Sequence, residues 1–230
     1  MKIKIVGLTG QTGSGKSEVA KLLISQGIDV IDCDRVSHNV ADTEKSCLCD
    51  LALEFSISIL NLDGTLNRKK LASIVFGDRA KLKKLNEIIF PYIKAEIASK
   101  IKKLDKMGKP LVILDAPTLF ESGLNKDCDF IISVVAPLEE RISRIVVRDH
   151  LTDEEARKRI SSQHDEEFFI ANTDAVIENK GSLSDLKEGT ARAVEKMCIT
   201  FSQLLKGEEK QKSGEIQSFD EISKEESKED

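Results

Sequence analysis

A glycine-rich segment near the N-terminus holds the residues with the clearest chemical potential. Residues 10–17 read GQTGSGKS and match the pattern G-x4-G-K-[ST] at every fixed position. The backbone N–H groups of such a loop, and the N-terminus of the helix that follows it, attract phosphate groups. In this pattern Lys16 reaches the β- and γ-phosphates of a nucleotide and Ser17 coordinates Mg²⁺. The sequence therefore predicts nucleotide contacts from Gly10, Thr12, Gly13, Ser14, Gly15, Lys16 and Ser17.

Acidic residues follow the second and third predicted strands. Ligands of open parallel sheets bind beyond the carboxyl ends of the strands, so Asp34 and Asp115 are expected near the glycine-rich loop. Asp34 could accept a proton from a substrate hydroxyl or orient Mg²⁺, or it could instead cap a helix that begins at Arg35. Asp115 ends a hydrophobic run, a pattern typical of a residue that contacts Mg²⁺ or its water. Asp32 alternates to the other face and is expected to make structural hydrogen bonds.

Three arginines follow the fourth predicted strand. Arg141, Arg144 and Arg148 are spaced by three and four residues, which places them on one face of a helix. Arginine suits bidentate contact with phosphate, although a salt-bridged surface helix would show the same spacing. The three histidines have no partner spacing and are interpreted as non-catalytic: His38, His150 and His164.

Short apolar runs alternate with helical patterns along the chain. Strands are predicted at residues 2–8, 28–31, 110–114, 130–135 and 175–177. Helices are predicted at residues 18–26, 34–58 and 67–107, from Pro137, from Thr152 and at 182–205, with Pro91 starting a new helix inside 67–107. Such alternation indicates a parallel sheet covered by helices on both faces. The helical segment between the second and third strands is too long for a simple crossover, so it is expected to form a separate lobe.

Motifs of other phosphate-loop proteins are missing. GTPases carry Asn-Lys-x-Asp for guanine, and the nearest match, at 125–128, ends in Cys128. The Leu-Ser-Gly-Gly signature of transporters does not occur. A short chain with a helical lobe after its second strand favours a kinase that acts on a small molecule.

The predicted fold is α/β, namely a P-loop kinase with a mostly parallel sheet flanked by helices, an inserted helical acceptor lobe and a helical lid. One kinase domain is expected over residues 1–206. Its core would comprise 1–33, 110–136 and 172–206, its acceptor lobe about 34–109 and its lid about 137–171. Residues 207–230 are rich in Glu, Lys and Ser and are predicted to form an acidic disordered tail.

Charge and composition bear on the class of partner and argue against nucleic acid. The tail carries four Lys and nine acidic residues, so it accounts for the whole net charge of −5. Residues 68–109 carry 13 basic and four acidic residues, which suggests either a solvated face or a wall facing an anionic small molecule. A neutral body with 4% aromatic residues argues against nucleic acid.

The sequence also indicates where the protein works. No apolar run approaches the roughly 18–20 residues of a membrane span, and no signal peptide is recognised. Five cysteines without a disulfide or zinc pattern are interpreted as reduced thiols packed as small apolar groups. We therefore expect a cytoplasmic protein that is not bound to a membrane.

A series of short blocks, in order along the chain, resembles one known family. The blocks are residues 7–16, 30–34, 63–68, 76–78, 85–86, 91, 115–121, 148–149, 159–163 and 174–181. Together they resemble the dephospho-coenzyme A kinases. The resemblance implies that the γ-phosphate of ATP is transferred to the ribose 3′-hydroxyl of dephospho-coenzyme A, the last step of coenzyme A synthesis.

The resemblance also implies roles for single residues. Lys16, Asp34 and Arg148 would be catalytic, with Asp34 as general base and Arg148 in the lid, and Asn179 would contact the nucleotide. The chain departs from the family pattern at Gln11, His38, Phe90, Thr118 and Phe169. Three of these changes, at positions 38, 90 and 169, remove or weaken polar groups expected near the acceptor. The alternatives are a kinase of another nucleotide-like or small-molecule alcohol and a non-catalytic nucleotide-binding regulator.

Overall fold

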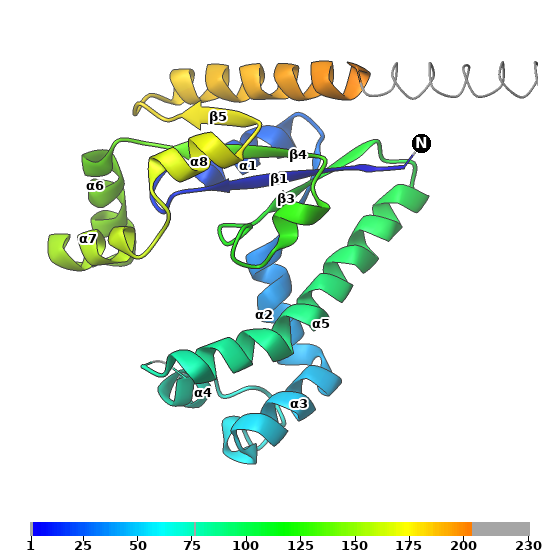
Figure 1. Ribbon diagram of the computed structural model, residues 1–230, viewed down its shortest axis with the longest axis vertical. Helices are drawn as coiled ribbons and strands as arrows, with labels where there is room; N and C mark the ends of the chain where they lie inside the picture. Colours follow the sequence, from blue (N-terminus) through cyan, green and yellow to red (C-terminus); the bar gives the residue numbers. More distant parts are fainter. Residues whose placement is uncertain (1, 76, 204–230) are drawn as a thin grey trace, which may run out of the picture.

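Five parallel strands form the centre of the molecule (Figure 1). The computed structural model describes residues 2–75 and 77–203. The strands are β1 (Lys4–Gly10), β2 (Asp29–Asp32), β3 (Leu111–Asp115), β4 (Phe130–Val135) and β5 (Ala175–Glu178). Their order in the sheet is β2-β3-β1-β4-β5, and every neighbouring pair is parallel. The parallel α/β sheet predicted from the sequence is confirmed, with strand ends shifted by one or two residues.

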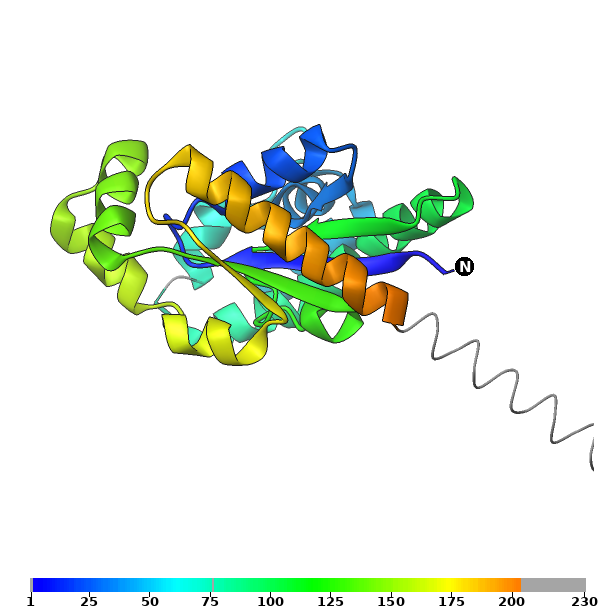
Figure 2. The same ribbon diagram turned by 90° about the horizontal axis from the view of Figure 1, so that it is seen from above.

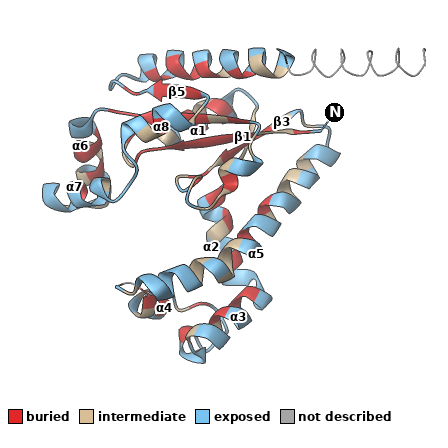
Figure 3. Ribbon diagram, in the orientation of Figure 1, coloured by how far each residue is buried: buried red, intermediate tan, exposed pale blue. Residues whose placement is uncertain are grey.

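Helices cover both faces of this sheet, as predicted (Figure 2). On one face, α1 (Lys16–Ser25) and the helix at residues 183–203 enclose a core around Leu8, Leu23 and Met197. The parallel strands are buried on both sides, so apolar residues line both faces and period-two alternation is lost. Burial is concentrated in this layer (Figure 3).

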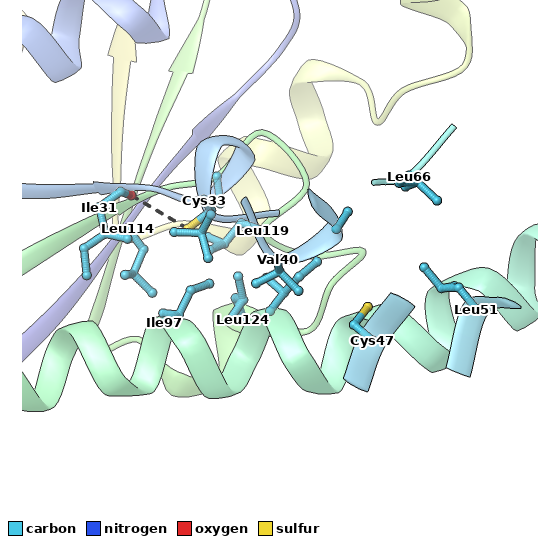
Figure 4. Close-up of a cluster of buried hydrophobic side chains, with 14 of the residues drawn as sticks. Ile31, Cys33, Val40, Cys47, Leu51, Leu66, Ile97, Leu114, Leu119 and Leu124 are labelled. Atoms are coloured by element: carbon cyan, nitrogen blue, oxygen red, sulfur yellow. Dashed lines mark hydrogen bonds between the residues drawn. The ribbon is translucent and has the colours of Figure 1, made fainter. Parts of the chain in front are cut away.

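The segment between β2 and β3 consists of helices that project beyond the sheet (Figure 1). They are α2 (Cys33–Thr43), α3 (Lys45–Phe55), the short 3-10 helix η1 (Ile57–Ile59), α4 (Arg68–Val75) and α5 (Arg79–Lys106). One hydrophobic cluster runs from Leu114 in the sheet, past Val40 and Ile97, to Leu51 and Leu66 (Figure 4). We call these helices the helical lobe; its predicted boundaries stay a prediction.

Helix α5 corrects one prediction. Pro91 does not start a new helix, because α5 is a single helix of 28 residues that passes through it. Proline removes one backbone hydrogen bond and bends a helix, yet Ile93 and Ile97 beyond it are buried against the lobe core and hold the helix together. The side chain of Asp78 caps the start of α5 by accepting from the N–H groups of Ala80 and Lys81.

Other helix boundaries also differ from the predictions. The helix predicted at 34–58 is divided into α2, α3 and η1, with Glu44 capping α3 through the N–H of Ser46. Helix α1 begins at Lys16, two residues earlier than predicted. The last helix is described as far as residue 203, so its predicted final residues and the tail predicted at 207–230 lie outside the described residues.

The segment between β4 and β5 folds into three helices. They are α6 (Leu138–Asp149), α7 (Asp153–Ser161) and α8 (Glu166–Asn172), and a further 3-10 helix, η2 (Leu124–Asp127), precedes β4. The predicted capping box is confirmed, since Thr152 and Glu155 exchange hydrogen bonds at the start of α7. Ile142 and Ile145 of α6 pack against α7, and this small core keeps α6 and α7 together.

The cysteines follow their prediction only in part. All five thiols are unpaired, and Cys33 and Cys47 are buried. Burial raises the pKa of Cys33 to about 12 and that of Cys47 to about 11, so both remain protonated thiols at neutral pH. Cys49 and Cys198 are exposed, which contradicts packing as apolar groups. No three His, Cys, Asp or Glu side chains form a metal-binding group in the described ranges.

Across residues 2–75 and 77–203, no helix combines the length and the apolar composition that a membrane span requires.

Candidate active site

The glycine-rich loop joins β1 to α1 at the carboxyl end of the central strand. Gly13 has a φ of 77°, in the left-handed region that glycine adopts without strain. A Cβ atom at Gly13 would lie 2.8 Å from the backbone oxygen of Arg141. The loop is therefore packed tightly against α6, and neither the backbone angle nor the space permits a side chain there.

A cleft of about 840 Å³ opens over this loop. Its wall includes Asp34 from α2, Pro117 and Thr118 after β3, and Arg148 from α6. The residues predicted to bind phosphate all line it: Gly10, Thr12, Gly13, Ser14, Gly15, Lys16 and Ser17. The sheet order brings these groups together, because β1 and β3 are neighbours and β2 lies next to β3.

Lys16 forms an ion pair with Asp115 at the base of the cleft. Its Nζ contacts Asp115 Oδ1, and the two side chains are only 13% and 14% exposed. Burial raises the pKa of Asp115, while the ammonium of Lys16 acts in the opposite direction. The lysine predicted to bind phosphates is thus held by a mostly buried carboxylate at the end of β3.

Asp34 lies in the first turn of α2, and it does not cap that helix. The cap is Asp32, whose carboxylate accepts a hydrogen bond of 2.8 Å from the N–H of Arg35. The structural role predicted for Asp32 is confirmed, and capping by Asp34 is excluded. Burial raises the pKa of Asp34, although Lys16 opposes the shift. A carboxylate with a raised pKa beside the phosphate loop is a better proton acceptor than an exposed one.

The three arginines of α6 occupy different environments. Arg141 is 5% exposed, and its Nε donates to the carbonyl oxygen of Thr12 at 3.0 Å. Arg144 donates to the carbonyl oxygen of Gly13 at 3.1 Å. Arg148 lines the cleft and pairs with Asp149 through two hydrogen bonds of 2.8 Å. Arg144 and Arg148 both line the cleft, whereas Arg141 does not, so the structure separates Arg141 from the other two.

Two further side chains bind the loop backbone. Asn179 is 6% exposed and donates from Nδ2 to the carbonyl oxygen of Ser14 at 2.8 Å. It is not among the residues that line the cleft, so its direct contact with a nucleotide stays a prediction. Gln163 accepts a hydrogen bond of 3.0 Å from the N–H of Thr12. For Asn179 the resemblance implied contact with the nucleotide, and for Gln163 it gave only membership of a matching block; neither pointed to these contacts with the loop backbone.

A second cavity, of about 700 Å³, lies on the helical lobe. Its wall combines the cations Arg79, Lys83 and Lys94 with apolar residues that include Phe90, and Ser122 closes one side. We call it the lobe groove. The turn after β3 borders both cavities, because residues 117 and 118 line the cleft and Ser122 lines the groove.

The structure separates the three substitutions expected near the acceptor. Phe90 lines the lobe groove. His38 accepts or donates a hydrogen bond of 2.8 Å between its Nδ1 and the carbonyl oxygen of Asp34, so it lies along α2 behind that residue. Phe169 is 4% exposed and packs edge-on against Phe120 and Phe168. Phe169 therefore belongs to an aromatic core and is absent from the walls of both cavities.

Comparison with known proteins places this site in a family context. The family description "Dephospho-CoA kinase" matches residues 4–185. A dephospho-CoA kinase of Fusobacterium nucleatum is 41% identical over 202 residues, covering 87% of this chain and 100% of that protein. One from Corynebacterium glutamicum is 35% identical over 189 residues, covering 82% and 94%.

Solved structures agree with the sequence relatives. A Thermus thermophilus protein superposes with a TM-score of 0.72 and 36% identity, covering 84% of this chain and 97% of that one. The dephospho-CoA kinase from Campylobacter jejuni gives a TM-score of 0.58 and 26% identity, covering 85% and 97%.

Proposed function

The chain belongs to the dephospho-CoA kinase family, and we propose that it transfers the γ-phosphate of ATP to the ribose 3′-hydroxyl of dephospho-coenzyme A. The products are coenzyme A and ADP. The observation that carries the proposal is the single cleft in which the phosphate loop, Asp34 and Arg148 meet. A bond forms between the hydroxyl oxygen and the γ-phosphorus, and the bond from that phosphorus to ADP breaks.

Each group has a role that follows from its position. The loop N–H groups and Lys16 bind the phosphates and spread the charge of the transferring group. Lys16 exchanges Asp115 for phosphate oxygens when the nucleotide binds. Asp34 orients the acceptor hydroxyl and takes its proton, a role supported by its place on the cleft wall and its raised pKa. Arg148 approaches from α6 and offsets negative charge.

The residues present fit a divalent cation of the Mg²⁺ type. Such an ion prefers oxygen ligands and keeps several waters and phosphate oxygens. Ser17 lines the cleft, and Asp115 contacts Lys16 of the cleft wall without lining the cleft itself. Burial disfavours the anionic form of the Asp115 carboxylate, so a cation beside it would favour its ionised form. Ser17 and Asp115 would hold the ion. When bound, it offsets charge on the β- and γ-phosphates.

The lobe groove is the proposed site of the acceptor's remote part. Dephospho-coenzyme A carries a pyrophosphate and a long pantetheine arm, which require cations and an apolar wall together. Arg79, Lys83 and Lys94 supply the cations, and Phe90 and Leu82 supply apolar surface. The turn shared by the two cavities would let one acceptor extend from the cleft into the groove.

The proposal also covers partner class and location. We take a small molecule, and not nucleic acid, as the partner, because a body without excess charge and with few aromatic residues offers little for base stacking. We place the reaction in the cytoplasm, because five unpaired thiols suit a reducing compartment.

The test is ADP release with ATP and Mg²⁺, measured with and without dephospho-coenzyme A, with the product identified by mass. We expect ADP release only with the acceptor and a product heavier by one phosphate group. Release without any acceptor would contradict a kinase. Nucleotide binding without transfer would favour another nucleotide-like alcohol as acceptor, or a non-catalytic regulator.

A further inference from the structure

Two carbonyl groups of the phosphate loop are held from inside the protein. The carbonyl of Thr12 accepts from Arg141 Nε at 3.0 Å, and the carbonyl of Ser14 accepts from Asn179 Nδ2 at 2.8 Å. Both donors are about 95% buried and neither lines the cleft. These two carbonyls therefore face the interior.

The direction of these carbonyls fixes the direction of two N–H groups. In a trans peptide the C=O and the N–H of the same unit point to opposite sides. If the carbonyls of Thr12 and Ser14 face inward, the N–H groups of Gly13 and Gly15 face the cleft. The N–H of Ser14, between them, is already used by the carbonyl of Gln11 at 3.1 Å. Gly13 and Gly15 thus supply two of the N–H groups that can bind an anion, and the buried side chains fix their direction.

The position of Arg141 suits it to hold the loop backbone and does not suit it to contact phosphate. Its side chain is buried and does not line the cleft, and Gly13 packs against its backbone. Its Nη2 has no hydrogen-bond partner among the described residues. Burying a guanidinium with one unpaired nitrogen costs free energy of folding. The hydrogen bond from its Nε to the loop carbonyl offers a functional reason for that cost.

We propose that Arg141 is a positioning residue that holds the phosphate loop in its nucleotide-binding conformation through the carbonyl of Thr12. This inference rests on the proposed nucleotide site but not on the identity of the acceptor. Without the bond, the competent loop is a smaller fraction of the population, and apparent affinity falls by that fraction. Because the loop holds the β-phosphate of both nucleotides, ATP and ADP lose affinity equally. A direct ligand of the γ-phosphate would instead weaken ATP more than ADP.

The test uses side chains of matched length at position 141. Gln places its Nε2 at the same number of bonds from Cα as the Nε of Arg, so R141Q keeps a donor near Thr12 without the charge. R141M fills the space and offers no donor. Binding of ATP and of ADP to the full chain is measured by calorimetry without an acceptor. We expect R141M to raise both dissociation constants about tenfold and to the same extent, and R141Q to raise them less than about threefold.

Two controls frame the result. R192M removes an arginine on the last helix that pairs with Glu188, and its affinities should match the wild type. R148M removes an arginine of the cleft wall and should weaken the binding of ATP more than the binding of ADP. If R141M does not fold, R141Q is compared with R141K, which keeps the charge but moves the donor one bond further out, and the Gln variant should bind both nucleotides more tightly.

Several outcomes would overturn the proposal. They are unchanged affinities in folded R141M, a loss for ATP that exceeds the loss for ADP, or equal losses in R141M and R141Q. A lower melting temperature with unchanged affinity of the folded fraction would indicate a merely structural arginine. Failure of the wild type to bind either nucleotide would instead count against the proposed function itself.

Discussion

The cleft and the lobe groove present their polar groups in opposite ways. Around the cleft, Arg141 and Asn179 are almost completely buried and bound to the loop backbone, and Lys16 is paired with Asp115. In the groove, the side chain of Lys83 is 80% exposed, with Glu87 at 3.8 Å as its ionic neighbour. The phosphate loop is thus held by buried side chains before a ligand arrives, whereas the groove has long side chains in water.

This difference indicates that the cleft and the groove contribute to different steps, the cleft to catalysis and the groove to acceptor binding. Fixed N–H groups and buried charges act without reorganisation, so they contribute to the transition state. Exposed lysines lose rotamer entropy when they bind, so each contributes modestly to the affinity for an anion. We therefore expect substitutions around the cleft to change turnover or nucleotide affinity strongly, and substitutions in the groove to change acceptor affinity mildly.

The largest effect is expected for Asp34→Asn. Removal of a general base lowers kcat by roughly 10²- to 10⁴-fold, because the amide cannot accept the hydroxyl proton. The affinity for ATP should change little, since the phosphate loop is intact. The measurement is steady-state ADP release together with nucleotide calorimetry.

Its matched control lies on the same helix. Asp42 is paired with Arg68 at 2.9 Å and is absent from the cleft wall. Asp42→Asn should retain wild-type turnover. Near-normal turnover in Asp34→Asn would exclude Asp34 as the base. It would also contradict the expectation that substitutions in the cleft affect turnover more strongly than substitutions in the groove.

A pair of glycines tests the rigidity of the cleft directly. Gly13 and Gly64 have φ values of 77° and 82°, but Gly13 is packed on Arg141 while Gly64 faces open space. Gly64→Ala should cost about 1 kcal/mol in free energy of unfolding and leave ADP affinity unchanged. Gly13→Ala carries the same backbone strain and must also displace the backbone of α6. We expect Gly13→Ala to raise the dissociation constant for ADP at least about 100-fold, as measured by calorimetry. Equal effects at both positions would show that packing around the loop is unimportant.

The acceptor should respond to lysines of the groove. Replacing both Lys83 and Lys94 with Ala should raise the KM for dephospho-coenzyme A about tenfold, since each exposed charge contributes up to about 1 kcal/mol. The KM for ATP should stay the same. Lys100→Ala is the control on the same helix, because Lys100 pairs with Glu96 and does not line the groove. An equal rise in KM for ATP would place the groove in nucleotide binding.

Sequence reading succeeded where a pattern is local. The strand predicted at 130–135 is β4 itself, and the capping box at Thr152 is present, because each depends on residues a few positions apart. Pro91 misled the prediction because the rule for proline is local, while the packing of Ile93 and Ile97 that carries α5 past it is tertiary.

The residues of the site also divide into those that a local motif predicts and those that only tertiary packing brings together. The phosphate loop is one contiguous motif, and its lining of the cleft could be predicted. Capping by Asp34, the alternative to its catalytic role, is wrong because α2 begins immediately after β2 and Asp32 caps it. That Arg141 binds Thr12, 129 positions away, could not be read from a three-and-four spacing, which describes only the helix face. The lobe groove likewise arises from segments joined only by folding.

The smallest effect concerns stability, and it should have opposite signs at Asp34 in the cleft and at Asp63 in the turn between η1 and α4. Burial raises the pKa of Asp34 above its ordinary 3.8, so the native state binds a proton more readily than the unfolded state. Its ionisation therefore disfavours folding as pH rises from 3.8 through the folded pKa. Asp63 accepts from the N–H and hydroxyl of Thr65, and these bonds lower its pKa, so its contribution is present above pH 3.8 and is lost as pH falls through the folded pKa.

Asparagine substitutions at Asp34 and Asp63 test the predicted directions of these two effects on stability. In calorimetric melts without nucleotide at pH 7, Asp34→Asn should raise the melting temperature slightly, and Asp63→Asn should lower it slightly. The gain from Asp34→Asn should disappear below pH 3.8, where the aspartate is protonated in both states. The loss from Asp63→Asn should shrink as pH falls through the lowered pKa. A stabilising Asp34→Asn that also stops turnover would show that the cleft retains a carboxylate at the expense of stability. A destabilising Asp34→Asn would mean that the charge of Lys16 outweighs burial at Asp34, and the two aspartates would then contribute to stability with the same sign.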